Sequence, residues 1–216
     1  MRNTHWLSAL LFPAMAGMII GCSASEEPAE PAHTLKPKAM DWSLVAKTQP
    51  ATRWYWLFDG ETLNSWTLHS GDAEWLAEEG ALTAVATGTP SHIATIAEYD
   101  NFAMTVDFFA EEGHAAGVII RGQSATDKET PINPVTGYEI NAAGTIRDLV
   151  AHQPASVTSG RWNTLEITAD GDHITVRLNQ QITADVHDST HATGIIALQA
   201  AGTGRVKYRN IKFRDL

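Results

Sequence analysis

The chain has 216 residues, of which 44% are hydrophobic and 19% are charged, proportions that are ordinary for a globular protein. Its 25 acidic residues outnumber the 15 Lys and Arg residues, which leaves a formal net charge of −10. An acidic surface repels phosphate backbones, and no run of Lys or Arg provides a local exception. The composition therefore argues against a nucleic-acid partner.

The first patterned segment is an apolar run over residues 6–20, which follows a short basic start. At about 15 residues it is too short to span a hydrocarbon core of roughly 30 Å, which favours a signal peptide over residues 1–21. The run ends in Ile-Ile-Gly-Cys at 19–22, which resembles the lipobox of bacterial lipoproteins. That resemblance implies cleavage before Cys22 and attachment of a lipid to its sulfur.

Two further expectations follow from this resemblance. Cys22 is the only cysteine, so the mature protein can contain no internal disulfide. Ser23 follows it rather than Asp, which in lipoproteins of Gram-negative cells implies sorting to the outer membrane. We therefore predict a protein of the bacterial cell envelope, held at the outer membrane by a lipid anchor. The alternative is an ordinary signal peptide with an incidental cysteine.

The segment after the anchor is rich in Pro, Ala and charged residues and has almost no large apolar side chains. Such a sequence cannot bury enough surface to offset the entropy of an ordered chain. We predict a tether over residues 22–52 and a single folded domain over residues 53–216.

From Arg53 onward the sequence is a series of short β-type runs separated by turn signals. The predicted strands are Trp54–Phe58, Ala81–Thr87, His92–Ala97, Phe102–Ala110, Gly117–Arg121, Gly137–Asn141, Trp162–Thr168, His173–Leu178, Gln181–Val186, Gly194–Ala200 and Val206–Phe213. Glu79-Gly80, Asp170-Gly171-Asp172 and Asn179-Gln180 are typical of turns between them. No long segment has a period of 3.6. This pattern predicts an all-β domain, a two-sheet sandwich of the jelly-roll type.

Alternation within these strands assigns side chains to faces, because the period of a strand is two. Four strands each place one polar residue opposite their apolar set, namely Asp107, Arg121, Glu139 and Gln199. If those strands are neighbours, an acid, a guanidinium and an amide converge on one sheet surface. Such a group could bind sugar hydroxyls and orient a reacting centre.

The closing stretch from Gly194 predicts a β-hairpin around a Gly-rich turn. In its first strand, Ile195, Ala197 and Gln199 alternate with Ile196, Leu198 and Ala200. In its second strand the alternation is less regular. Read strictly, it places Val206, Tyr208, Asn210, Lys212 and Arg214 on one side, and Lys207, Arg209, Ile211 and Phe213 on the other.

Several blocks of this region together resemble one family. They are WLFDGETLNSW (56–66), YDNFAMTVDFFAEEGHAAGVIIRG (99–122), GYEIN (137–141), GRWNTLEITADGDHITVRLNQQ (160–181) and the closing GIIALQ…VKYRNIKFRDL. In this order and spacing they are similar to the 3-keto-disaccharide hydrolase domain family, long known only as a domain of unknown function. The resemblance covers roughly residues 54–216.

The resemblance implies a concanavalin-like jelly roll and an activity on glycosides already oxidised at C3. A 3-ketone acidifies the C2 proton, so a base can remove it and the enolate can expel the oxygen at C1. Water then adds to give the free 3-keto sugar. This path needs a base, a stabiliser for the enolate oxygen and an acid for the leaving group. No cofactor is evident in the sequence, although a divalent cation could stabilise the enolate instead.

By position, Arg121, Glu139 and Gln199 match the Arg, Glu and Gln of the family's motifs. The resemblance implies Glu139 as proton acceptor or metal ligand, and Arg121 as stabiliser of developing charge. Asn141 and Gln199 would bind sugar hydroxyls, as would Asp107 from the shared face. The alternatives are that Arg121 and Glu139 form only a cross-strand ion pair, and that Asn141 and Gln199 satisfy only loop backbone groups.

This sequence departs from the family in its central segment. Ala115-Ala116-Gly117 stands where the family has Asn-Ser-Gly, and the loop after Gly-Tyr-Glu is short. These changes place metal binding and full catalytic competence in question. His114 could replace a lost group as acid or base, or could be a solvated loop residue. The other histidines have no zinc-like spacing, so no metal ligand is assigned.

Aromatic residues offer a further choice between a ligand site and the core. Trp75 is the best candidate for a platform that stacks on a pyranose ring, whereas Trp162 is expected in the core. Two functions therefore remain open: a surface-anchored enzyme that cleaves 3-keto-glycosides, and a lipoprotein that binds glycans without chemistry. In both, the partner is a carbohydrate, oxidised in the first case.

Overall fold

The structure is a computed structural model that describes residues 53–112, 115–124, 135–149 and 156–216. These residues form β-strands and no helix, which confirms the all-β prediction. None of them belongs to a helix that is long and apolar enough to cross a membrane. The predicted signal peptide, Cys22, the tether and His114 lie outside the described residues.

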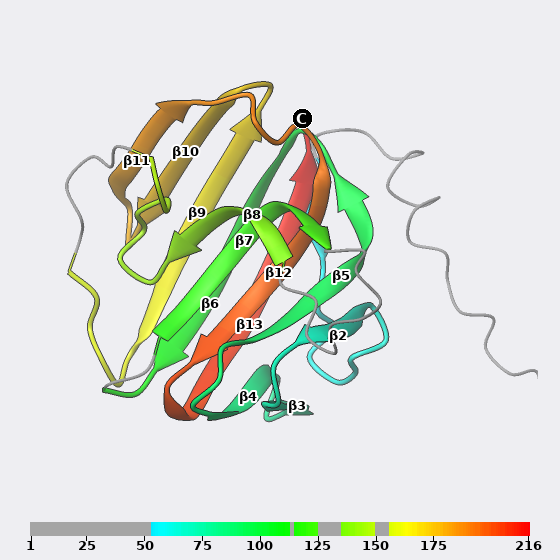
Figure 1. Ribbon diagram of the computed structural model, residues 1–216, viewed down its shortest axis with the longest axis vertical. Coiled ribbons are helices and arrows are strands. Elements are labelled where there is room, and N and C mark those ends of the chain that lie inside the picture. The colour runs from blue at the N-terminus through cyan, green and yellow to red at the C-terminus, as the bar shows by residue number, and fades with distance from the viewer. Residues whose placement is uncertain (1–52, 113–114, 125–134, 150–155) are drawn as a thin grey trace, which may run out of the picture. The chain divides into compact units, whose positions relative to one another are not determined.

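The strands form two antiparallel sheets that lie one over the other in Figure 1. The larger sheet has eight strands, and β1 pairs with β13 beside the main order β11-β10-β9-β6-β13-β4-β3. Its strands are β1 (Tyr55–Trp56), β3 (Glu74–Glu78), β4 (Ala81–Thr87), β6 (Phe102–Ala110), β9 (Trp162–Asp170), β10 (His173–Leu178), β11 (Gln181–His187) and β13 (Thr203–Asp215).

The smaller sheet has five strands in the order β2-β5-β12-β7-β8. They are β2 (Trp66–Ser70), β5 (Ser91–Tyr99), β7 (Ala115–Ser124), β8 (Val135–Asn141) and β12 (Gly194–Ala201). The hairpin predicted from Gly194 therefore does not form, because β12 and β13 belong to different sheets. The chain turns at Gly202, whose φ of 93° favours glycine, and crosses from one layer to the other.

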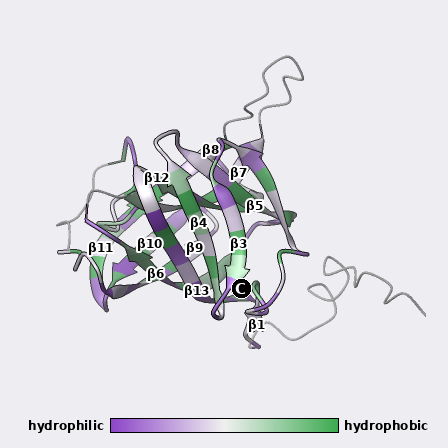
Figure 2. Cartoon of the chain, turned by 90° about the horizontal axis from the view of Figure 1, so that it is seen from below, coloured by the Kyte–Doolittle hydropathy of each residue, from purple (hydrophilic) through white to green (hydrophobic). Residues whose placement is uncertain are grey.

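The hydrophobic core fills the space between the two sheets. In β6, Phe102, Met104, Val106 and Phe108 all point inward and are at most 1% exposed. In β12, Ile196 and Leu198 do the same from the other layer. Figure 2 shows hydrophobic stretches in strands of both layers. Each large apolar side chain buried in this way contributes about 1.5–3 kcal/mol relative to its exposed state.

The predicted turns at Glu79-Gly80 and Asn179-Gln180 are confirmed as two-residue hairpin loops. All four residues have positive φ angles, between 49° and 72°. Two successive positive φ angles match the right-handed twist of the flanking strands. Strands β2 and β3 were not predicted, because Trp66–Ser70 and Glu74–Glu78 are short and carry no clear run of β-branched residues.

A β-bulge in β13 causes the irregular alternation there, and the placement of Lys212 and Arg214 on the side of Val206 and Tyr208 is wrong. The pairing of β13 with β6 shifts between Arg209 and Lys212, and Asn210 has a φ of 52°. The extra residue keeps Val206, Tyr208, Ile211 and Phe213 in the core. The cationic residues on either side of the bulge consequently share the outer face.

Candidate functional site

The predicted polar surface is divided between the two sheets. Asp107 belongs to β6 in the eight-stranded sheet, whereas Arg121, Glu139 and Gln199 belong to the five-stranded sheet. The carboxylate of Asp107 accepts hydrogen bonds of 2.7 Å from Thr164 Oγ1 and from Asn210 Nδ2. The expectation that all four residues share one face is therefore wrong, because β6 and β7 lie in opposite layers.

Arg121 does not point to the outer face either. The pairing of β7 with β8 is irregular between Ile120 and Gln123, and Arg121 has a φ of 49°. Its side chain is buried, with 1% of the residue exposed. The guanidinium donates to the backbone carbonyls of Asp100 (3.0 Å), Gly171 (2.7 Å) and His191 (3.1 Å), and to Asn101 Oδ1 (3.3 Å). Arg121 thus joins three loops, and it is not paired with Glu139.

Glu139 and Gln199 do share the outer face of the five-stranded sheet. Gln199 pairs with His92 on one side and with Gly117 on the other, and Gly117 pairs with Asn141. The next row across the sheet is Ala94, Ala197, Ile119 and Glu139. From β5 to β8 this face spans three strand spacings, or about 14 Å.

An apolar floor separates the polar groups on this face. It is a cluster of five buried side chains, Ala94, Ile119, Val135, Ile195 and Ala197. These residues point away from the main core, since their strand neighbours fill it. At 0–8% exposure these side chains form a small second core on this side of the sheet, with the polar groups around it.

His92 is the sheltered polar group at one side of this floor. It is 8% exposed, and its Nε2 lies 3.1 Å from Gln199 Nε2. An amide nitrogen only donates, so in this orientation of Gln199 the ring nitrogen accepts. A neutral imidazole with its proton on Nδ1 satisfies this contact and the one to Ser70 Oγ at 2.6 Å.

Burial lowers the pKa of His92 below its ordinary value, and the charge of Glu139 acts in the opposite direction. The charge of nearby His69 lowers it further. Desolvation dominates because it disfavours the charged imidazolium. The influence of Glu139 and His69 shows that all three groups act within one electrostatic environment.

Gly117 and Tyr208 hold Gln199 in position. A Cβ at Gly117 would lie 2.9 Å from Gln199 Oε1, so the absence of a side chain lets the amide lie across the strand. The hydroxyl of Tyr208, from the other sheet, accepts from the Gly117 N–H at 3.0 Å. It also contacts the carbonyl oxygens of Gly117 and Gln199. The position of Gln199 thus depends on both layers.

Glu139 lies at the other side of the floor and pairs with Arg147. Arg147 Nη2 is 2.5 Å from Glu139 Oε1, and the Arg147 N–H donates to the Glu139 carbonyl at 2.9 Å. The short segment between them forms a turn. Asn141 Oδ1 accepts hydrogen bonds from the backbone N–H groups of Ala143 (2.9 Å) and Thr145 (3.2 Å), and Asn141 Nδ2 donates to Thr145 Oγ1 (2.6 Å). Asn141 therefore stabilises its own loop, as the alternative stated above anticipates.

Trp75, the tryptophan predicted as a platform, has a structural role. Trp75 is 9% exposed, donates from Nε1 to Ser91 Oγ at 3.0 Å and stacks near Tyr208. The prediction of Trp75 as a platform is wrong, because β3 places its ring in the core. Trp66 is also buried. The expectation that Trp162 lies in the core is wrong: it is half-buried, and the Arg209 guanidinium lies 3.9 Å from its ring centroid.

Sequence reasoning missed His92, Ser70 and Arg147. His92 begins a strand that was predicted, and its alternation with Ile93 could have placed it on the outer face. Arg147 lies eight residues after Glu139, and a hairpin through the Gly144 turn could have paired them. Among the described residues, no three His, Cys, Asp or Glu side chains lie together in a way that could hold a metal ion.

Comparison with known proteins identifies the family of this domain. Residues 53–214 match the 3-keto-alpha-glucoside-1,2-lyase-like domain, which is the 3-keto-disaccharide hydrolase domain family. The chain belongs to this family. The resemblance stated from the sequence blocks is thereby confirmed. No relative is found among curated proteins.

Solved structures confirm the fold of this 3-keto-alpha-glucoside-1,2-lyase-like domain. A candidate glycosyl hydrolase from Parabacteroides distasonis ATCC 8503 matches with a TM-score of 0.59 and 25% identity, over 76% of this chain and 100% of its own. A Bacillus subtilis protein of unknown function with a galectin-like fold gives 0.56 and 11%, over 71% and 90%. Carbohydrate binding module CBM66 from Bacillus subtilis gives 0.53 and 17%, over 70% and 96%.

Proposed function

We propose that this chain is a carbohydrate-active enzyme of the bacterial cell envelope that cleaves 3-keto-glycosides by elimination across C1–C2 followed by hydration. The proposal rests on the outer face of the five-stranded sheet. On it, a carboxylate paired with arginine lies across an apolar floor from a neutral imidazole. Family membership supplies the class of substrate.

In this proposal Glu139 removes the proton from C2 of the oxidised sugar. The electron pair of the broken C–H bond forms the C2–C3 double bond, and negative charge develops on the C3 oxygen. The Arg147 guanidinium, which contacts the Glu139 carboxylate at 2.5 Å, is the nearest cation to this charge. It takes the stabilising role that the sequence assigned to Arg121.

The second step expels the glycosidic oxygen from C1 as the enolate returns its electron pair. The departing oxygen takes a proton from a water molecule on the His92 side of the face. The hydroxide that remains adds to C1, and Glu139 returns its proton to C2, which gives the free 3-keto sugar and restores the carboxylate. The neutral state of His92 suits it to exchange protons with water near neutral pH.

A glycan-binding protein without catalysis is the second candidate. It is favoured by the loss of free polar groups, since Arg121 is bound to loop carbonyls and Asn141 to its own turn. The similarity to CBM66, a carbohydrate binding module, is compatible with it. The two candidates differ in whether an oxidised disaccharide is bound or cleaved.

The deciding experiment is the turnover of 3-keto-trehalose by the full chain and by Glu139→Gln, with release of the 3-keto sugar as the readout. We expect at least a hundredfold loss of kcat in the variant, with an unchanged melting temperature. Glu78→Gln is the matched control, because Glu78 pairs with Arg205 at 2.6 Å on the other sheet. Full activity of Glu139→Gln would remove Glu139 from the mechanism. Binding without product in the wild type would establish the second candidate.

The lipid anchor is a separate part of the proposal. Labelled palmitate should enter the wild-type protein in cells and not the Cys22→Ala variant, which should leave the membrane fraction. Equal labelling of both proteins would overturn the anchor and the envelope location that rests on it.

A further inference from the structure

The outer face of the eight-stranded sheet carries a row of cations along β13. Arg205, Lys207, Arg209, Lys212 and Arg214 all project from this strand. The bulge at Asn210 brings the last two onto the same face as the first three. A chain with a net charge of −10 therefore has one strongly basic strand.

The first three cations of this row are paired with carboxylates. Arg205 contacts Glu78 at 2.6 Å and Lys207 contacts Glu79 at 3.3 Å. Arg209 lies 3.6 Å from Asp107. Each of these positive charges is therefore balanced by a neighbour.

The last two cations contact indole rings instead. Lys212 Nζ lies 4.6 Å from the ring centroid of Trp56, and the Arg214 guanidinium lies 5.4 Å from that of Trp54. Neither forms an ion pair with a carboxylate in the described part of the chain. At the end of the row, neither positive charge has a described carboxylate oxygen within 4.0 Å.

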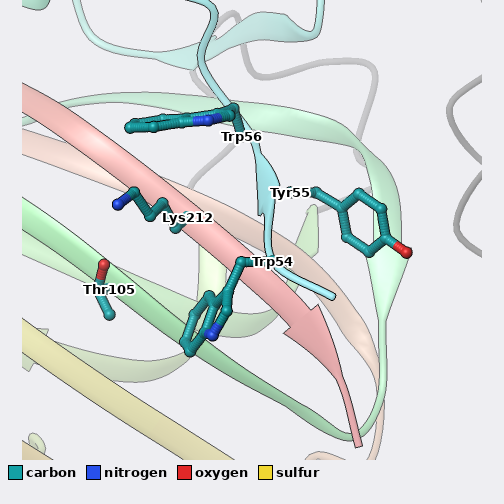
Figure 3. Close-up of a pocket in the computed structure, with 5 residues that line it drawn as sticks. All are labelled: Trp54, Tyr55, Trp56, Thr105 and Lys212. Carbon is teal, nitrogen blue, oxygen red and sulfur yellow. The ribbon is translucent and has the colours of Figure 1, made fainter. Parts of the chain in front are cut away.

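A pocket opens at this end of the row. It has a volume of about 330 Å³ and is lined by Trp54, Tyr55, Trp56, Thr105 and Lys212. Figure 3 shows the Lys212 side chain between the two indoles, with Tyr55 turned to the other side. Trp54 and Trp56 are 42% and 56% exposed, which is unusual for side chains of this size.

We propose that this pocket binds an anionic pyranoside, a sugar ring that carries a carboxylate or a sulfate. The C–H face of a pyranose suits the exposed indoles, whose large apolar surfaces remain in water in the free protein. The anionic substituent reaches the Lys212 ammonium, which lines the pocket. Thr105 offers a hydroxyl for a ring oxygen.

The charge of the ligand follows from a difference along β13: the first three cations are paired with carboxylates, and the last two contact indole rings. A neutral sugar would gain only the stacking and one or two hydrogen bonds. An anionic sugar also gains the attraction of these last two cations, while the acidic remainder of the surface repels it elsewhere. The site lies on the sheet opposite to the one that carries Glu139, so it is a second binding site and does not depend on the proposed reaction.

The test is an NMR titration of the full chain that follows its indole N–H signals. Trp54→Phe and Trp56→Phe assign the two relevant signals. The probes are methyl β-D-glucuronide, the 6-sulfate of methyl β-D-glucoside, and neutral methyl β-D-glucoside. We expect both signals to shift with an anionic probe that binds about tenfold more tightly than the neutral one, and more weakly in high salt. Whether the glucuronide or the sulfate binds more tightly identifies the type of anion.

Matched variants locate the site. Lys212→Gln should weaken binding of the anionic probe about threefold to tenfold and leave the neutral probe unchanged, whereas Lys207→Gln, whose charge is paired with Glu79, should change neither. Trp56→Ala should weaken all probes about tenfold. Equal affinity for neutral and anionic probes, equal effects of the two lysine variants, or no shift of either signal would overturn the proposal. Glu139→Gln should bind the probes as the wild type does.

Discussion

Two arginines, one in β7 and one in the turn after β8, show how position decides what a side chain can do. Arg121, in β7, is 1% exposed and uses its guanidinium on three loop carbonyls and one amide. Arg147, just after β8, has a side chain that is 65% exposed and contacts one carboxylate. The donors of the buried arginine are already used in hydrogen bonds within the fold. The exposed one keeps donors that a substrate can reach.

The largest expected effect comes from removing the buried arginine. Arg121→Met should lower the free energy of unfolding by about 3–5 kcal/mol, because it leaves several buried carbonyl oxygens without a donor. Urea denaturation measures this loss. Arg177→Met is the control, since Arg177 is exposed and makes one long hydrogen bond of 3.4 Å to Gln180. A loss below about 1 kcal/mol at Arg121 would mean that water replaces the guanidinium readily.

The exposed arginine should show the opposite pattern. Arg147→Gln should reduce kcat on 3-keto-trehalose by about tenfold to a hundredfold, because the developing enolate loses its nearest cation. The free energy of unfolding should change by no more than about 1 kcal/mol, because the Arg147 side chain is 65% exposed. Arg205→Gln breaks a similar pair of 2.6 Å on the other sheet and should leave kcat unchanged. If both variants lose activity equally, Arg147 has no special role.

A smaller effect is expected where the backbone of β7 passes under Gln199. In Gly117→Ala the new methyl group would lie 2.9 Å from Gln199 Oε1 and 3.3 Å from the Ile140 carbonyl. The flexible amide should move away, so the free energy of unfolding falls by only about 1 kcal/mol. KM should rise severalfold because His92 loses its partner. An unchanged KM would show that Gln199 does not bind substrate.

The smallest expected effect is a pH dependence of stability that arises at His92. Burial lowers the pKa of His92 in the folded protein, so below pH 6.5 the unfolded chain binds a proton that the folded one does not. The free energy of unfolding should therefore fall as pH decreases through 6.5 towards the folded pKa, and should be unaffected above it. His92→Gln should lose this contribution when thermal unfolding is followed across the same pH range. Identical pH profiles for both proteins would contradict the neutral state assigned to His92.

Local patterns were sufficient to predict most strands but not the partners of each strand. The alternation in Phe102–Ala110 predicted which side chains are buried, and the structure agrees. The same alternation could not reveal that β6 and β7 lie in different sheets. Asp107 was therefore grouped with residues from which the core separates it. Sheet assignment depends on pairings between residues far apart in the sequence, which a single sequence does not display.

The candidate site was only partly predictable for a related reason. Glu139 and Gln199 were found because they match family motifs on regular strands. Arg121 matches its motif equally well, yet an irregularity in β7 turns its side chain toward the loops. His92 owes its importance to Ser70 and to Gln199, which is 107 residues away in the sequence. Irregular backbone and long-range contacts are the two features that alternation does not capture.

The hydroxyl of Tyr208 has a consequence for how the domain opens. The N–H of Gly117 in the five-stranded sheet donates to this hydroxyl, which comes from the eight-stranded sheet. Most strand amides become exchangeable when a neighbouring strand peels away. This amide becomes exchangeable only when the two layers separate. The rate of hydrogen–deuterium exchange at the Gly117 amide would therefore report how often the two sheets separate, whereas exchange at edge strands reports fraying.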